Sequence, residues 1–183
     1  MPCALYPWSS HVGNAQPRGI GRVRQQRRAR YTGAKDKVEY RMPGTLTDDE
    51  VNAFLDSRPR WIILTTLGRD GYPHSVPIGY FRVGEDIFIG CRAGTQKLKN
   101  IERDPKVSLL LESGQTMADI KGVMIQGDAR VVTEPGEVLE LMRAAARARG
   151  VAEEQLPAEP RPGAAYIHVT RKKVISWDYG IEG

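Results

Sequence analysis

The chain has 183 residues, of which 40% are hydrophobic and 27% are charged, and its formal net charge is +5. This length and composition are typical of a single soluble globular domain with a sizeable core. No apolar run approaches the roughly 20 residues of a membrane-spanning helix, and the N-terminus lacks the continuous apolar core of a signal peptide. The two cysteines, Cys3 and Cys91, show no metal-ligand or redox spacing. We therefore expect a cytoplasmic protein without a membrane partner.

The positive charge is concentrated at the N-terminus. Residues 1–40 hold eight Lys and Arg against two acidic residues, a net charge of +6, so residues 41–183 carry −1. The composition of residues 1–40, without a sustained apolar period, predicts a disordered basic tail. Such a tail is either an arm without a specific function or a weak, salt-sensitive polyanion-binding segment. A nucleic-acid-binding domain would carry its basic face on the folded body, so no specific nucleic-acid partner is expected.

The folded body is predicted over residues 41–183 and begins with a short helix. Thr47 and Glu50 have the spacing of a capping box, in which each side chain accepts a hydrogen bond from the backbone N–H of the other residue. Apolar residues at 51, 54 and 55 then form the stripe of a short amphipathic helix. The pair Arg58-Pro59 is expected to end this helix, because the residue before proline is pushed out of the helical region.

Three strands are expected next, at residues 61–67, 73–81 and 87–91. The first two are joined by a turn at 68–71, whose Asp-Gly pair supplies the positive φ of a hairpin turn. The second strand contains Pro77, which cannot donate a hydrogen bond to a sheet ladder. Pro77 therefore predicts a sheet edge, a bulge, or a position where another group meets the backbone.

The second half of the chain shows a short helix, two strands, a longer helix and two closing strands. The short helix ends at Asp104-Pro105, and the longer one begins near Pro135, a favoured first helical residue. Several short strands joined by hairpins predict a mainly β fold, an antiparallel barrel with flanking helices, rather than a doubly wound sheet. The strands are expected at 107–111, at 123–132 with a break at Gly127, and at 165–170 and 174–177, and the longer helix at 137–149.

The first turn of the short helix is the strongest candidate binding site. Thr95, Gln96 and Lys97 are expected to lie where backbone N–H groups are free and the helix dipole is positive, which suits an anion. Lys97 and Lys99 are alternatively only solvated charges on an exposed helix face.

Catalytic motifs are absent from the sequence. The histidines His11, His74 and His168 are too far apart in the sequence to form a metal-ligand pair, so no metal site is expected. We find no nucleophile elbow, Walker loop or dinucleotide-binding fingerprint, and no catalytic residue is assigned. Trp177 and Tyr179 are either core residues or cover a planar ligand or a partner subunit. A chain of this kind is an enzyme only if a cofactor supplies the chemistry.

Four sequence blocks, at residues 64–80, 94–111, 121–132 and 174–178, resemble the flavin/deazaflavin oxidoreductase superfamily. These are the split β-barrel proteins related to pyridoxamine 5'-phosphate oxidase, and the resemblance covers about Leu46 to Asp178. It is greatest for the actinobacterial group that uses the deazaflavin coenzyme F-420, in which a similar L-E-x-G-x-T loop follows the strand after the short helix. The resemblance implies a split β-barrel cofactor-binding domain at residues 41–183.

The resemblance also implies a homodimer that holds two cofactors in clefts between its subunits. Lys97, helped by Thr95 and Gln96, would bind the cofactor phosphate, and Asn100 would brace that turn. Relatives often carry a basic residue where this chain has Thr95. The phosphate would therefore be bound more weakly here, or Lys99 would also contact it. The remaining implied residues are Val76, Pro77 and Ile78, whose backbone groups would line the tricyclic ring, and Trp177, which would close the cleft from the other subunit or its rim.

The function implied by the resemblance is hydride transfer from reduced F-420 to an unsaturated small molecule. An FMN-dependent oxidoreductase of the same fold is the first alternative, and a non-catalytic cofactor-binding or storage protein is the second. Oxidation of vitamin B6 is not expected, because the additional arginine motifs that bind the phosphate of that substrate are missing. The same fold hosts several chemistries, so the fold alone does not decide between these readings.

Overall fold

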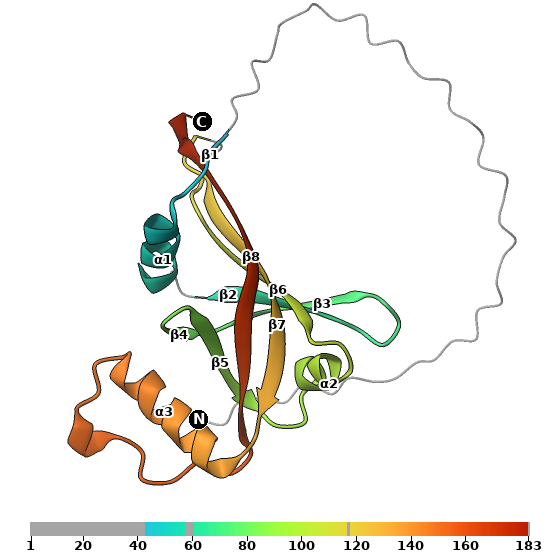
Figure 1. Cartoon of the computed structure of the whole chain (residues 1–183), viewed down its shortest axis with the longest axis vertical. Coiled ribbons are helices and arrows are strands. Elements are labelled where there is room, and N and C mark those ends of the chain that lie inside the picture. The colour runs from blue at the N-terminus through green and yellow to red at the C-terminus, as the bar shows by residue number, and fades with distance from the viewer. Residues whose placement is uncertain (1–42, 58–60, 117, 183) are drawn as a thin grey trace, which may run out of the picture. The chain divides into compact units, whose positions relative to one another are not determined.

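An antiparallel β-sheet is the central element of the described chain (Figure 1). The structure is a computed structural model, and it describes residues 43–57, 61–116 and 118–182. The basic tail predicted at residues 1–40 and the helix end predicted at Arg58-Pro59 lie outside the described residues. No helix in the described part of the chain is long and apolar enough to cross a membrane.

The described elements follow one another in an order close to the predicted one. They are β1 (Pro43–Gly44), α1 (Asp48–Ser57), β2 (Ile62–Leu67), β3 (Pro73–Ile78), β4 (Phe81–Val83), β5 (Asp86–Arg92), α2 (Gln96–Arg103), β6 (Lys106–Ser113), β7 (Lys121–Val132), α3 (Pro135–Arg147), the 3-10 helix η1 (Glu153–Gln155) and β8 (Ala164–Glu182). The strand order is β3-β2-β6-β7-β8-β5-β4, with β1 paired to β8 and all pairs antiparallel. This curled antiparallel sheet with its flanking helices confirms the predicted split β-barrel.

The start of α1 is built as its sequence predicts. The backbone N–H of Thr47 donates to Oε2 of Glu50 at 2.8 Å, and the N–H of Glu50 donates to the Thr47 hydroxyl at 3.3 Å. The N–H of Thr47 and its hydroxyl, which also donates to Oε2 of Glu50 at 3.0 Å, lower the pKa of the Glu50 carboxyl. Val51, Phe54 and Leu55 are buried in the core. The capping box and the apolar stripe are therefore both confirmed.

The hairpin between β2 and β3 also follows the prediction. Gly71 has a φ of 84°, and its N–H donates to the carbonyl of Gly68 at 3.0 Å. Since β3 ends the strand order, Pro77 lies in an edge strand, paired in register with Ile63 of β2. An edge is one of the three environments that the proline predicted.

The extents of several strands were predicted wrongly. The strand expected at 73–81 ends at Ile78, and β4 is a separate short strand paired with β5. The closing strands expected at 165–170 and 174–177 are one strand, β8, and β1 was not predicted. The basic residues 171–173, expected to separate the two strands, continue β8 and pair with β7 across a bulge between Gln126 and Gly127.

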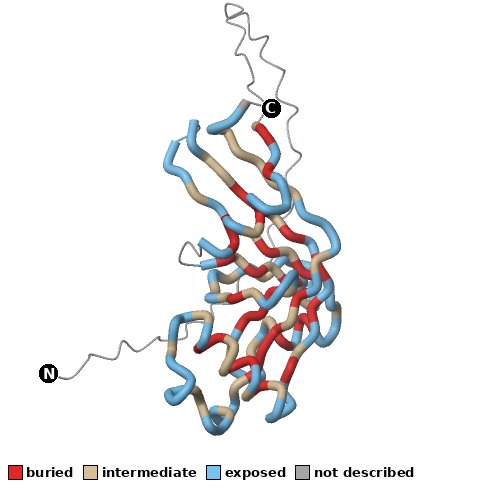
Figure 2. Tube along the Cα trace, turned by 60° about the vertical axis from the view of Figure 1, so that its left-hand side comes forward, coloured by how far each residue is buried: buried red, intermediate tan, exposed pale blue. Residues whose placement is uncertain are grey.

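The core lies on the inward face of the curled sheet, where buried segments alternate with exposed ones along the strands (Figure 2). Ile62 and Leu64 of β2 and Leu109 of β6 are fully buried. A second apolar cluster joins α3 to β4 and β5, and it includes Phe81 and Phe88, which stack at 5.5 Å between ring centroids. Burial of this apolar surface supplies the main favourable term in folding.

The outward face of the sheet carries an apolar row that crosses five strands. Its members face one another in register, from Pro77 on β3 through Ile63, Leu110 and Met124 to Ile175 on β8. Ile63, Leu110, Met124 and Ile175 remain half-buried, whereas Pro77 is exposed. We call these five residues the outer apolar row. In chain order they are separated by charged and buried segments, so the row exists only in the folded sheet.

Candidate cofactor site

The first turn of α2 is open to an anion. Gly94 turns the chain with a φ of 73°, and Thr95 occupies the N-cap position with extended backbone. The Thr95 hydroxyl does not cap the helix, because it donates to the carbonyl of Arg92 at 3.1 Å. The first turn also contains no acidic residue. The positive end of the helix dipole and the amides of this turn are thus left without a side-chain acceptor.

Asn100 ties this turn to the sheet. Its side chain is fully buried; Nδ2 donates to the hydroxyl of Thr66 at 3.0 Å, and Oδ1 accepts from Nε2 of Gln96 at 2.8 Å. Thr66 is itself buried, and its hydroxyl donates to the carbonyl of His74 at 3.4 Å. One hydrogen-bonded chain therefore runs from the start of α2 through β2 to β3. This geometry suits the bracing role that the resemblance implies for Asn100.

The two lysines of α2 differ in their surroundings. Lys97 is half-buried and lies near Cys91 at the end of β5, whereas Lys99 is exposed. Burial raises the pKa of the Cys91 thiol, and the nearby Lys97 ammonium partly opposes this shift. Gln96 directs its side-chain amide to Asn100. Only its backbone N–H is then available for an anion at the first turn.

The backbone of Val76, Pro77 and Ile78 lies along the free edge of the sheet. Val76 and Ile78 pack their side chains against the core, while Pro77 points outward. Because β2 is the one described strand that pairs with β3, the other side of the β3 backbone is open within the described chain to a ligand or a second chain. Val76 pairs with Leu64, two residues from the Thr66 that Asn100 contacts. These predicted ring contacts therefore belong to the same part of the barrel as α2.

Trp177 lies elsewhere in the chain. It pairs with Gly122 of β7, and a Cβ at position 122 would overlap the indole ring. The chain just after α2 contacts β7 at Ala129, seven residues along β7 from Gly122. There the N–H of Ala129 donates to the carbonyl of Pro105. At about 3.3 Å per strand residue, the Gly122 pairing lies roughly 23 Å from that point. One chain does not bring Trp177 to Lys97.

The loop that resembles the F-420 group is held by Asp119. Its carboxylate accepts hydrogen bonds from the hydroxyl and the N–H of Thr116, both at 2.6 Å, and from the N–H of Gln115 at 3.2 Å. The Thr116 hydroxyl is the main cause of the lowered pKa of the Asp119 carboxyl. Asp119 therefore fixes the backbone of Gln115 and Thr116, at the end of this loop.

Two features of the molecule were not predicted from the sequence. One is the outer apolar row, and the other is a pocket that contains Arg92, Arg149 and Arg161. Both depend on strand register or on segments far apart in the sequence, so no local pattern indicates them. Across residues 43–57, 61–116 and 118–182, no cluster of His, Cys, Asp and Glu could hold a metal ion.

Comparison with known proteins agrees with the fold described above. Residues 47–178 match the family described as pyridoxamine 5'-phosphate oxidase. Among curated proteins, none matches the sequence.

Three solved structures illustrate the likeness. The conserved hypothetical protein Rv2991 of Mycobacterium tuberculosis is 26% identical, with a TM-score of 0.63 over 73% of this chain and 86% of that chain. An F-420 reductase is 18% identical, with a TM-score of 0.52 over 68% and 94%. The haem storage protein HutZ of Vibrio cholerae is 14% identical, with a TM-score of 0.53 over 73% and 98%. The last two likenesses are those of the fold alone.

Proposed function

Because the chain belongs to the pyridoxamine 5'-phosphate oxidase family, whose split β-barrel it shares, we propose that it is an oxidoreductase that uses the deazaflavin coenzyme F-420. The observation that carries this proposal is the first turn of α2, which has no side-chain cap and no acidic residue and which presents the half-buried Lys97. Such a turn suits the phosphate of a flavin or deazaflavin. In the proposed site, the phosphate is bound by Lys97 and by the backbone amides of Thr95 and Gln96. The exposed Lys99 adds a positive charge near it.

The residues of the chain bind and orient the cofactor rather than react. When bound, reduced F-420 would supply a hydride from its C5 to an unsaturated carbon of the substrate, and a proton from solvent would complete the reduction. The backbone at Val76–Ile78 lines one side of the ring, and the buried Asn100–Thr66 contact keeps α2 and β2 in fixed register around it. A site that fixes the ring by backbone contacts on a rigid strand holds the two reacting atoms at a productive separation.

Two observations favour different readings of the cofactor and the activity. The resemblance of the loop at residues 111–116 to the F-420 group favours the deazaflavin over FMN, which is the alternative cofactor. The fold is shared with the haem storage protein HutZ, so a binding or storage protein without turnover is the second alternative. The reactions hosted by one fold differ, so the cofactor and the turnover must be tested separately.

The test of turnover compares bound with free cofactor. Reduced F-420 is mixed with the full chain and with a panel of enones, quinones and biliverdin, and its reoxidation is followed by absorbance. An oxidoreductase accelerates reoxidation by at least one acceptor over the rate with free cofactor. Tight binding without acceleration by any acceptor would favour the storage reading.

We also propose that the chain acts as a homodimer. The outer apolar row leaves Leu110, Met124 and Ile175 half-exposed on one sheet face, and such a face fits a second copy about a two-fold axis. The separation of Trp177 from Lys97 supports the same arrangement, because a second copy is then the source of the tryptophan that closes the cleft. Each cleft would thus need both chains.

Replacing Leu110 with glutamate is expected to break the dimer. A charge in the middle of an apolar interface loses its hydration without gaining a partner. Sedimentation at micromolar concentration should give about twice 20.4 kDa for the parent chain and 20.4 kDa for the variant. The control is Val83→Glu, which changes an exposed apolar residue on β4 outside the row. A monomeric parent that binds cofactor, or a Leu110→Glu variant that stays dimeric, would contradict the shared cleft.

A further inference from the structure

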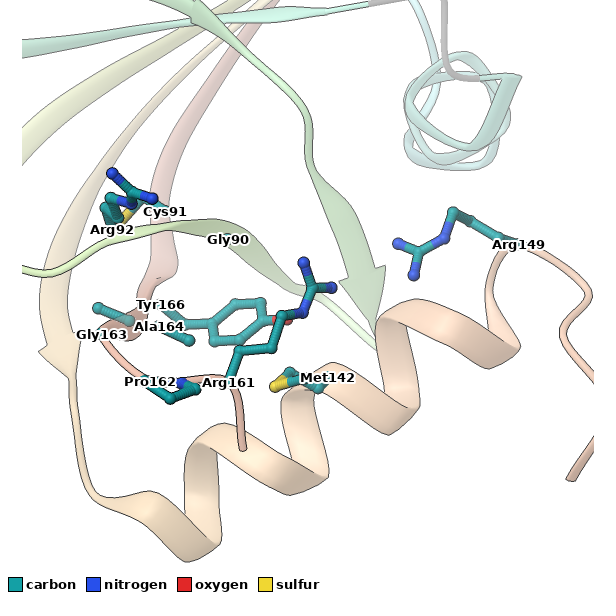
Figure 3. Close-up of a pocket in the computed structure, with 11 residues that line it drawn as sticks. Gly90, Cys91, Arg92, Met142, Arg149, Arg161, Pro162, Gly163, Ala164 and Tyr166 are labelled. Carbon is teal, nitrogen blue, oxygen red and sulfur yellow. The ribbon is translucent and has the colours of Figure 1, made fainter. Parts of the chain in front are cut away.

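A pocket lies between α3, the end of β5 and the start of β8 (Figure 3). Its volume is about 420 Å³, and an adjoining cavity of about 380 Å³ shares Gly90, Arg149 and Tyr166 with it. No residue of the candidate cofactor site lines either cavity. The two cavities therefore form a separate space for a ligand.

The lining of the larger cavity is positively charged. It contains Arg92, Arg149 and Arg161 and no acidic residue. Among the described residues, no ion pair involves these three arginines. Elsewhere, five arginines each pair with a carboxylate: Arg82, Arg130, Arg143, Arg147 and Arg171. Three unpaired guanidinium groups around one cavity leave their donors available to an anion, which arginine binds through two parallel hydrogen bonds.

Tyr166 forms the floor between the two cavities. Burial raises the pKa of its phenol, and the nearby guanidinium groups of Arg149 and Arg161 partly oppose this shift. In Figure 3 the Arg161 guanidinium lies beside the hydroxyl end of Tyr166, and the Arg149 guanidinium points toward it from the end of α3. Tyr166 pairs with Gly90, where a Cβ would come within 3.2 Å of its ring, so the glycine keeps the space above the ring open.

The adjoining cavity is the apolar half of the site. It is lined by Tyr80, Phe81 and Ala145 together with the shared residues, and Phe81 meets Tyr166 edge-on at 6.1 Å between ring centroids. Burial of an apolar group against these side chains would be favourable. The charged and apolar cavities meet at the ring of Tyr166.

We propose that this pocket binds a small anionic molecule, whose carboxylate or phosphate meets Arg149 and Arg161 and whose apolar body lies against Tyr166, Phe81 and Ala145. Arg92, at the rim, adds positive charge. The residues proposed for the cofactor phosphate lie on the first turn of α2, which adjoins this pocket at Arg92 but does not line it.

Calorimetric titration of the full chain with four probes tests the proposal. Phenylacetate and phenyl phosphate represent the two anionic heads, acetate lacks the apolar body, and phenylacetamide lacks the charge. We expect at least one of the aromatic anions to bind at least about tenfold more tightly than acetate and phenylacetamide. Comparison of phenylacetate with phenyl phosphate identifies the preferred head group.

Variants connect this binding to the arginines. The double variant Arg149→Gln/Arg161→Gln should weaken binding of the preferred aromatic anion by at least about tenfold. Arg69→Gln removes one positive charge from an exposed turn outside the pocket and should leave this binding unchanged. The three altered arginines are exposed, so thermal unfolding should confirm that each variant folds. Equal affinity of the double variant, equal binding of phenylacetamide, or no binding of either aromatic anion at millimolar concentration would overturn the proposal.

Discussion

Replacing Lys97 with alanine is expected to weaken cofactor binding by about 10- to 100-fold. A hydrogen bond to a charged group contributes about 1.5–3 kcal/mol, and each tenfold change in affinity corresponds to about 1.4 kcal/mol. Lys97 is half-buried at an uncapped helix start, where the field of the helix adds to its own charge. Fluorescence titration of F-420 with the parent and variant chains measures the difference.

Lys99→Ala is the matched control for this prediction. Lys99 is exposed and lies two residues further along α2, where the helix has turned it to another side. Its removal should weaken binding much less than removal of Lys97. Both variants should fold, because the buried apolar residues of α2 are Leu98 and Ile101. A Lys97→Ala variant that binds as tightly as the parent, or a larger loss for Lys99→Ala, would mean that this helix does not hold the phosphate.

Replacing Asn100 with leucine should lower the free energy of unfolding by about 2–4 kcal/mol, because it removes hydrogen bonds from a buried polar network. The substitution leaves the fully buried Thr66 hydroxyl without the donor from Asn100, and it releases the Gln96 side chain. Urea unfolding followed by circular dichroism measures this change. The variant should also bind F-420 more weakly, since the first turn of α2 is no longer tied to β2.

A double-mutant cycle separates the contribution of the Asn100–Thr66 hydrogen bond to stability from the general cost of altering a buried residue. Thr66→Val removes the other member of the pair, and valine leaves no hydroxyl without a partner. The double variant Asn100→Leu/Thr66→Val should therefore be more stable than the sum of the two single losses predicts, by more than about 0.5 kcal/mol. Strict additivity would show that the Asn100–Thr66 hydrogen bond does not couple α2 to β2.

The features that the sequence predicted well depend on a few neighbouring residues. The capping box of α1 needs only Thr47 and Glu50, and the β2–β3 turn needs only the Asp-Gly pair. The end of α2 follows in the same way from Asp104-Pro105, where the backbone becomes extended. Each of these signals acts over four residues or fewer, so no knowledge of the sheet is required.

The features that the sequence did not predict depend on register. Residues 171–173 look like a break, yet they continue β8 because β7 lies beside them with a bulge at Gly127. The outer apolar row exists because Ile63, Leu110 and Met124 face one another across three strands. A shift of one residue in any strand would move its side chain to the other face.

The candidate site was predictable in part. The short helix, its open first turn and Lys97 follow from the sequence around residues 93–105, and the structure supplies the burial of Asn100 and its contact with Thr66. The distance between Trp177 and this helix was not predictable, because it depends on where β8 pairs with β7. The arginine pocket was not predictable either, since its residues come from β5, the end of α3 and the loop before β8.

The most direct test of the proposed function is equilibrium titration of the full chain with F-420 and, separately, with FMN. We expect saturable binding of F-420 at one molecule per chain, with higher affinity than for FMN. In the Lys97→Ala variant, the affinity for F-420 should fall by about 10- to 100-fold. Tight binding of FMN without measurable binding of F-420, or F-420 binding that does not depend on Lys97, would contradict it.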